Sequence, residues 1–271
     1  MNNVAVFDAT EEQRLKEAMG MIPENIQSDR LPLLKINTDD ENEDGQAIPR
    51  ATMYLRDVAD ISYAKDIKIR VLGQHYQYIE YDPDQNKTVC KTLINKSFKQ
   101  EFLDTRGTSK CGMTKPKSKM EQYEKERFKN VTYFRHLRVL VTYKGVDAEG
   151  NSVTVENQPA LMLLKGSNFM PFEDEVVKKL PRGASLCDFW IDVSLERMKN
   201  GSVTYYVMHY KFDASKVETF DTQTADTFRH FASMVEGENT RILDQHKSAI
   251  ISRSAPTYEV PVDASLEADF A

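Results

Sequence analysis

Residues 189–212, FWIDVSLERMKNGSVTYYVMHYKF, are the stretch that decides the fold. Apolar and polar residues alternate along 189–195, which is the two-residue period of a strand with one buried face. Asn200-Gly201 then supplies a dipeptide that strongly favours a tight hairpin turn, and residues 203–212 return with tyrosine, valine and methionine. The stretch therefore predicts a β-hairpin, and with it an antiparallel sheet.

Strand patterns also precede the hairpin. The longest alternates along residues 67–81, and Gly73 marks a place for a bulge in its middle. Shorter patterns cover residues 31–36, 51–57, 88–94, 131–144, 153–156 and 160–165. With the hairpin, they predict a protein of the α+β class that is mainly β.

Helices are expected on both sides of these strands. Ser167 is a suitable N-cap residue, and Gly237 is expected to break a long helical stretch near the C-terminal end. The helices predicted are residues 9–19, 167–180, 224–235 and 240–250, and the second half of the basic stretch, 119–129, is a further candidate helix.

The order of elements is three strands, a helix and a two-strand hairpin, which is the order of an OB-fold. We therefore expect an OB-like antiparallel barrel with an inserted basic arm and flanking helices. The expected division is an N-terminal extension with a helix and an acidic loop (1–60), the OB-like domain (61–213) with a basic insertion at about 96–130, C-terminal helices (214–253) and an acidic disordered tail (254–271).

Charge is distributed unevenly along the chain. The formal net charge is −6, yet acidic residues concentrate in the run 39–44 and in the tail 254–271, which contains no Lys or Arg. Residues 106–129 contain eight Lys or Arg against three acids. The acidic total therefore does not exclude a polyanion as partner, because a local basic surface can bind it.

Several classes of protein are disfavoured. Motifs for nucleotide binding, serine hydrolysis and zinc proteolysis are absent, so we do not expect an enzyme. Three widely spaced cysteines indicate reduced thiols, and Cys111 has no second cysteine at zinc-site spacing, so no metal or cofactor is expected. The lack of a long apolar run or a signal segment predicts no membrane contact and a cytoplasmic location.

A groove for single-stranded nucleic acid needs cations for phosphates and aromatic faces for bases. By alternation, the four candidates on strand 67–81, which are Lys68, Arg70, Tyr76 and Tyr78, share one face, although a bulge at Gly73 would move the two tyrosines to the other face. The alternative interpretation is that this face is exposed to solvent and binds no ligand. Trp190 lies on the polar side of its strand, where it is a candidate for a stacking or partner contact. The alternative interpretation is that it packs under helix 167–180. The candidates are Lys68, Arg70, Tyr76, Tyr78, Lys91, Lys110, Lys115, Lys117, Lys119, Arg135, Arg138, Trp190 and Tyr205.

Four short segments suggest a family when they are combined with the OB-like order. They are Leu31-Pro32-Leu33-Leu34-Lys35-Ile36, Gly166-Ser167-Asn168-Phe169, the Asn200-Gly201 hairpin with Val203-Thr204-Tyr205-Tyr206, and the terminal Asp269-Phe270. In these features the chain resembles a phage single-stranded DNA-binding protein of the OB-fold type with an acidic, aromatic-ended tail.

The resemblance implies sequence-tolerant, non-catalytic binding of single-stranded DNA in phage replication or recombination, in the cytoplasm of an infected bacterium. It also implies that the tail competes with DNA for the basic groove and recruits a polymerase, helicase or primase of phage or host. The tail residues that would do so are Glu259, Asp263, Glu267, Asp269 and Phe270.

Two other functions stay open from the sequence. One is a virion or assembly protein without nucleic-acid binding, which would also be rich in β-structure and free of motifs. The other is a nuclease or accessory enzyme with carboxylate-bound Mg²⁺. A homodimer and a preference for RNA over DNA are open as well.

Overall fold

The computed structural model describes residues 30–41, 47–57, 60–112 and 119–254. The expected helix 9–19 and the acidic tail lie outside these ranges, and so do Lys115 and Lys117. None of the helices in the described ranges combines the length and the apolar character needed to cross a bilayer.

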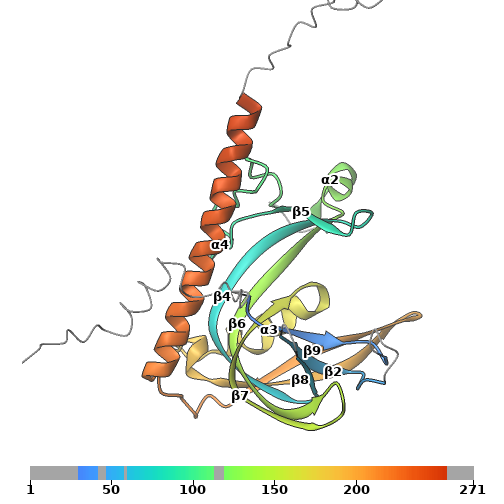
Figure 1. Ribbon diagram of the computed structural model, residues 1–271, viewed down its shortest axis with the longest axis vertical. Coiled ribbons are helices and arrows are strands. Elements are labelled where there is room, and N and C mark those ends of the chain that lie inside the picture. Colours follow the sequence, from blue (N-terminus) through green and yellow to red (C-terminus); the bar gives the residue numbers. More distant parts are fainter. Residues whose placement is uncertain (1–29, 42–46, 58–59, 113–118, 255–271) are drawn as a thin grey trace, which may run out of the picture. The chain divides into compact units, whose positions relative to one another are not determined.

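The described residues form two compact units. The first contains residues up to 72, 138–163 and 170–227, and the second contains residues 73–137, 164–169 and those from 228 onward. The boundaries lie inside β4 (Ile67–Asp82), β6 (Val131–Asp147) and α4 (Thr222–Ser254), so each of these elements contributes to both units. β4 and β6 run as two long neighbouring strands (Figure 1).

The first unit contains a closed ring of five strands. β1 (Leu33–Asn37), β2 (Thr52–Arg56) and β3 (Ile61–Ala64) pair in antiparallel order, and β3 pairs with the end of β6. β7 (Ser152–Leu164) is the neighbour of β6 and closes the ring by running parallel to β1.

Two expectations about this barrel need correction. The barrel is not wholly antiparallel, because β1 and β7 run in the same direction with Leu33 opposite Leu161. β1 and β2 belong to the ring, although the sequence placed them in an N-terminal extension, and the sequence did not predict β3 at all. These short strands have too few residues to show a clear period.

The sheet continues beyond the ring in the order β7-β6-β4-β8-β9. β8 (Trp190–Asn200) and β9 (Val203–Phe212) form the predicted hairpin, with pairs from Ile191 and Phe212 to Asn200 and Val203. β7 is one strand where two fragments were expected. The core of this unit is largely aliphatic, although Phe172, Phe189 and Tyr210 are also buried in it. Its other buried residues include Ile69, Val71, Val139, Val141, Met162, Ile191 and Val193.

The helix after β7 begins differently from the expectation. Gly166 has a positive φ of 56° and opens a 3-10 turn, η2 (Gly166–Asn168), with Lys165 at the capping position instead of Ser167. α3 (Phe169–Glu175) and a second 3-10 turn, η3 (Val177–Lys179), complete the segment, and η4 (Leu186–Asp188) precedes β8.

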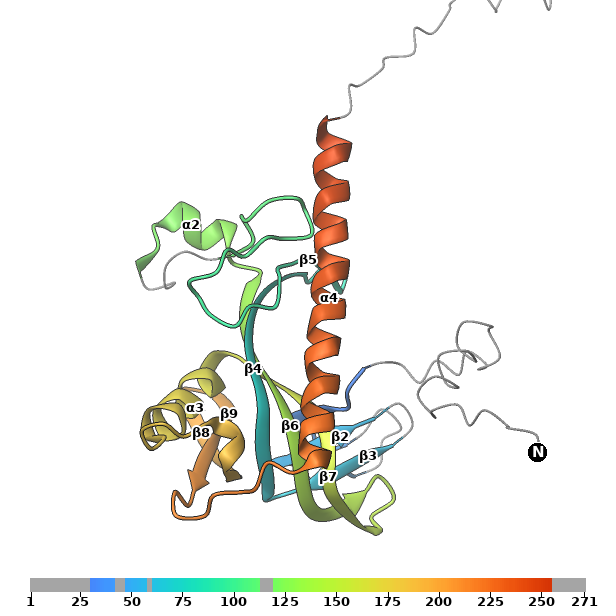
Figure 2. The ribbon, with the colours of Figure 1, turned by 90° about the vertical axis from the view of Figure 1, so that its left-hand side faces the viewer.

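α4 is one uninterrupted helix of 33 residues, so the expected break at Gly237 does not occur (Figure 2). A mid-helix glycine costs only about 1 kcal/mol relative to alanine. Contacts in the second unit offset that cost: Asn239 exchanges hydrogen bonds with the backbone of Ile94 at 2.8 and 3.0 Å, and His246 Nδ1 bonds to the Asp104 carbonyl at 2.8 Å.

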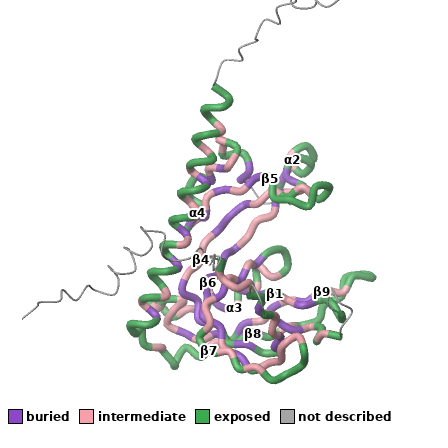
Figure 3. Tube along the Cα trace, viewed as in Figure 1, coloured by how far each residue is buried: buried purple, intermediate pink, exposed green. Residues whose placement is uncertain are grey.

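The second unit has its own core, built from aromatic and sulfur-containing side chains. The members are Tyr76, Tyr78, Cys90, Phe102, Cys111, Met120, Phe128 and Val131. They come from β4, β5 (Lys87–Lys91), β6 and the insertion, whose predicted helix is α2 (Gln122–Arg127). The described part of the insertion is therefore a packed segment, with buried stretches that alternate with exposed ones (Figure 3).

A buried carboxylate organises the insertion. Asp104 is fully buried and accepts hydrogen bonds from the backbone N–H groups of Arg106, Thr108 and Cys111 at 3.0–3.1 Å and from the Thr108 hydroxyl at 2.6 Å. These bonds satisfy the charge that burial would otherwise make unfavourable. The loop 104–111 is therefore fixed by one side chain.

Two glycine substitutions test this description. A Cβ at Gly145 would lie 2.1 Å from the Tyr63 carbonyl oxygen, whereas a Cβ at Gly237 would meet nothing within 4 Å. We expect Gly145→Ala to lower the free energy of unfolding by about 2–4 kcal/mol and Gly237→Ala to raise it by about 0.5–1 kcal/mol. Urea unfolding followed by Trp190 fluorescence and far-ultraviolet circular dichroism measures both, and a destabilising Gly237→Ala would contradict the continuous helix.

Candidate nucleic-acid interface

The open face expected on strand 67–81 is not formed. Lys68 is exposed, but Arg70 is 5% exposed, and Tyr76 and Tyr78 belong to the core of the second unit. Arg70 donates to the carbonyls of Cys187 and Thr219 at 2.7 and 2.9 Å and to the Thr224 hydroxyl at 3.3 Å. Its guanidinium is therefore a structural group that holds the chain around residues 187 and 219–224.

Alternation along 131–144 predicts that Phe134, His136, Arg138 and Lys144 point outward from β6. Lys144 is exposed, but His136 and Arg138 are buried, and so is the candidate Arg135. Arg135 is 1% exposed, and His136 and Arg138 are each 5% exposed. The alternation rule fails here because both faces of this central strand are covered. Arg138 is therefore not on a surface that phosphate can reach, whereas Arg135 contributes to an aromatic cluster described below.

The other predicted residues are scattered. Lys91 forms an ion pair with Glu238, and Lys110 and Lys119 are exposed. Tyr205 is half-buried in the hairpin opposite Met198. Lys115, Lys117 and the five tail residues lie outside the described ranges.

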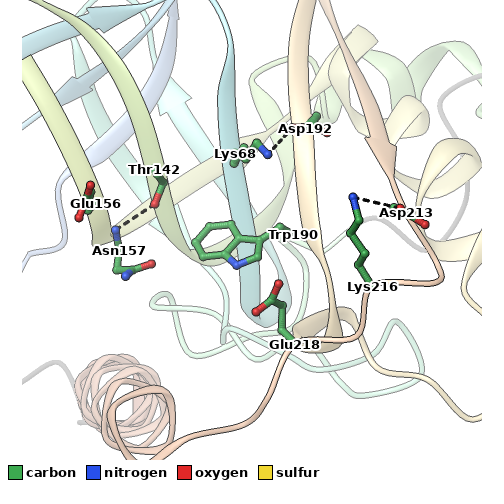
Figure 4. Close-up of a pocket in the computed structure, with 9 residues that line it drawn as sticks. All are labelled: Lys68, Thr142, Glu156, Asn157, Trp190, Asp192, Asp213, Lys216 and Glu218. Carbon is green, nitrogen blue, oxygen red and sulfur yellow. Dashed lines mark hydrogen bonds and ion pairs between the residues drawn. The ribbon is translucent and has the colours of Figure 1, made fainter.

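Trp190 is neither fully exposed nor packed in a core. It is half-buried and lines a pocket of about 390 Å³ in the first unit (Figure 4). The other lining residues are Lys68, Thr142, Glu156, Asn157, Asp192, Asp213, Lys216 and Glu218.

The charge of this pocket disfavours a polyanion. Four of its lining residues are acids and two are lysines. Both lysines already have carboxylate partners, Lys68 with Asp192 at 3.7 Å and Lys216 with Asp213 at 3.4 Å. A phosphate that entered would therefore meet two uncompensated acids, so the Trp190 pocket is a poor site for a nucleic-acid backbone.

A second group of aromatic residues lies in the second unit, and the charged residues that flank its exposed ring in the sequence are lysines instead of acids. Phe98 is 50% exposed, and its ring centroid lies 4.4 Å from that of Tyr76 and 5.0 Å from that of Tyr133. Tyr133 continues the contact to Phe169 at 4.8 Å. We call Phe98, Tyr133 and Phe169, with Tyr76 beneath them, the aromatic surface.

A buried cation supports the aromatic surface. The guanidinium of Arg135 lies 4.4 Å from the ring centroid of Phe169 and 5.7 Å from that of Tyr76. Such contacts are favourable by about 2 kcal/mol when the cation is shielded from water. Arg135 therefore holds two of the four rings in fixed positions, although it cannot itself reach a phosphate.

Exposed lysines stand beside the exposed ring in the sequence, and another lies over a neighbouring residue of Tyr133. Lys96 and Lys99 flank Phe98 in the sequence and are exposed, and the Lys165 ammonium lies 5.6 Å from the Phe134 ring centroid. The segment is held by backbone bonds between Tyr76 and Asn95 at 2.8 and 2.9 Å. The Gln100 side chain also accepts a bond from the Lys96 N–H at 2.9 Å, so the loop that carries Phe98 is ordered.

Sequence reasoning found only part of this surface. It selected Tyr76, Tyr78 and Arg135, which the structure brings together, and it missed Phe98, Tyr133 and Phe169. A signal for Phe98 was present in Lys96-Ser97-Phe98-Lys99, where an aromatic residue stands between two lysines. Tyr205 is disfavoured as a contact, because His209, on the same side of the return strand by alternation, lies between Glu175 and Glu196 at 2.9 and 2.7 Å.

Comparison with known proteins gives no relative for this chain: no protein-family model, curated protein or solved structure matches it. The functional argument therefore depends on the geometry and charge of the two units.

Removal of Arg70 separates a structural role from a binding role. We expect Arg70→Ala to lower the free energy of unfolding by about 3 kcal/mol, because two backbone carbonyls and the Thr224 hydroxyl lose a buried, charged donor. Lys68→Ala, its neighbour on the same strand, should change stability by no more than about 0.5 kcal/mol, because its ion pair is exposed to solvent. Urea unfolding monitored by Trp190 fluorescence compares the two, and equal effects would contradict the buried role of Arg70.

Proposed function

We propose that this protein binds single-stranded DNA without sequence preference and without catalysis. The observation that carries the proposal is Phe98, which is half-exposed, packs at a tilt against Tyr76 and Tyr133, and is flanked in the sequence by Lys96 and Lys99. An exposed ring offers a stacking face to any base, and lysines beside it neutralise the adjoining phosphates. Stacking on an aromatic side chain contributes about 1–3 kcal/mol per base.

The order of elements supports an OB-like assignment. β4, β6 and β7 precede α3, and β8 and β9 follow it, so these elements have the OB-fold order of three strands, a helix and two strands, with β5 and α2 inserted between β4 and β6. These strands are contiguous in the sheet, in the order β7-β6-β4-β8-β9. OB-like barrels bind oligonucleotides, which favours a nucleic-acid ligand over an unrelated one.

The aromatic surface favours a single strand over a duplex. Bases in a duplex are stacked on each other and present only their edges, so a half-exposed phenyl ring has no face to contact. Direct reading of base edges requires hydrogen-bonding side chains, whereas the rings here contact bases through dispersion. We therefore assign sequence tolerance and single-strand preference to the same residues.

Substitution of Phe98 tests the proposal. We expect Phe98→Ala to weaken the binding of labelled oligo(dT) by about 5- to 100-fold, which corresponds to the loss of one stacked base. Phe220→Ala is the matched control, because Phe220 is also 50% exposed but lies in the first unit. Fluorescence anisotropy at fixed salt measures both affinities.

Three outcomes would overturn the proposal. Equal losses in the two variants would show that Phe98 has no special contact. Failure of the intact protein to retain oligo(dT) at about 50 mM salt would favour the virion or assembly function. Metal-dependent turnover of the DNA would favour the enzyme.

We further propose that the acidic tail competes with DNA and recruits replication proteins. Residues 254–271 contain four acids and no Lys or Arg, so they can occupy the same lysines as a phosphate backbone. Phe270 adds an aromatic group for a pocket on a polymerase, helicase or primase. Binding of DNA would displace the tail and make it accessible to that partner.

Deletion of residues 254–271 is expected to tighten oligo(dT) binding several-fold at low salt, and the gain should vanish at high salt because the attraction is screened. A variant with Glu259→Gln, Asp263→Asn, Glu267→Gln and Asp269→Asn should reproduce the gain, whereas Phe270→Ala should not. Anisotropy titrations at two salt concentrations measure these changes. Unchanged or weaker DNA binding by the truncated chain would refute the competition.

A further inference from the structure

Three metal-binding side chains meet in the second unit, at a place that the proposed DNA contact does not use. A carboxylate oxygen of Glu80, Sγ of Cys90 and Sγ of Cys111 all lie within 4.8 Å of one another. Glu80 is on β4, Cys90 on β5 and Cys111 in the insertion. The two cysteines are 1% and 4% exposed, so the cluster is buried on its sulfur side.

We propose that Glu80, Cys90 and Cys111 form a binding site for one Zn²⁺ ion or a similar thiophilic divalent metal. Zinc bonds sulfur at about 2.3 Å and carboxylate oxygen at about 2.1 Å, so donors on one tetrahedral zinc lie about 3.5–4 Å apart. The three atoms are therefore close to that arrangement and need only small side-chain rotations. Two sulfur donors favour zinc over Mg²⁺ or Ca²⁺, which prefer oxygen ligands.

Neighbouring groups hold each donor in place. Arg106 Nη1 contacts the Glu80 carboxylate at 2.8 Å, and the Thr105 hydroxyl lies 3.7 Å from Cys90 Sγ. Asp104 accepts the hydrogen bond from the Cys111 backbone at 3.1 Å. Such outer contacts orient metal ligands and raise metal affinity.

The charges also balance. Two thiolates and one carboxylate carry three negative charges, which Zn²⁺ and the Arg106 guanidinium neutralise together. Cysteine binds zinc as a thiolate, so metal binding would release the thiol protons of Cys90 and Cys111 to solvent.

The consequence of binding would be local cross-linking. Cys90 and Cys111 enclose the segment that carries Phe98, so a metal between them would tie both ends of that segment to β4. A ligand that binds only the folded state stabilises it in proportion to the logarithm of its concentration over its Kd. The site therefore predicts a metal-dependent rise in the stability of the second unit.

The experiment uses the full-length chain, reduced and freed of metal, and titrates it with Co²⁺ as a spectroscopic substitute for zinc. We expect one Co²⁺ per chain, with a thiolate-to-cobalt charge-transfer band that Zn²⁺ abolishes by displacement. Cys90→Ser and Cys111→Ser should lose the band. Cys187→Ser is the matched control and should keep it, because the third cysteine lies in the first unit.

A second variant covers the case in which a serine variant fails to fold. Glu80→Gln keeps both sulfurs and should weaken Co²⁺ binding at least tenfold while the charge-transfer band survives at saturation. A reduced wild-type chain without the band would overturn the proposal. So would a band that persists in folded Cys90→Ser or Cys111→Ser, or that disappears in folded Cys187→Ser.

Discussion

Two strands that each contribute to two hydrophobic cores are the constraint on which the structure depends. The first part of β4 supplies Ile69 and Val71 to the aliphatic core, and its second part supplies Tyr76 and Tyr78 to the aromatic core. In β6 the order is reversed: its first part contributes Val131 to the aromatic core, and its second part contributes Val139 and Val141 to the aliphatic core. Because both strands are covered on both faces along much of their length, several polar side chains within them, such as Arg70 and Arg135, are buried and must be held by specific contacts.

This constraint explains why Arg70 and Arg135 within these strands are structural groups, although Lys68 near the start of β4 is exposed. Arg70 holds backbone carbonyls and Arg135 supports aromatic rings, and neither is exposed. The proposed DNA contact therefore involves Phe98 and its flanking lysines, which lie on a short ordered loop. The Trp190 pocket also has an aromatic wall, but its excess of acids disfavours the binding of a DNA backbone.

The sequence predicted the elements with a clear local signal. Residues 189–212 showed a two-residue period and an Asn-Gly turn, and β8 and β9 follow them closely. It could not predict the parallel pairing of β1 with β7, because no local pattern encodes which distant strand closes a ring. It placed Arg138 outward because alternation assumes one solvated face, and it broke α4 at Gly237 because propensity does not include the contacts of Asn239. The sequence did not indicate the cluster of Glu80, Cys90 and Cys111, because its donors come from separate segments and no local pattern encodes their contact.

The central claim is that unpaired bases stack on the aromatic surface of the second unit. Photo-cross-linking tests it most directly, with an oligonucleotide in which iododeoxyuridine replaces thymidine, followed by mass spectrometry of the cross-linked peptides. The account predicts cross-links to Phe98 or Tyr133 that excess unlabelled single strand removes and excess duplex does not. Cross-links confined to Trp190, or a bound oligonucleotide that cross-links to neither Phe98 nor Tyr133, would contradict it.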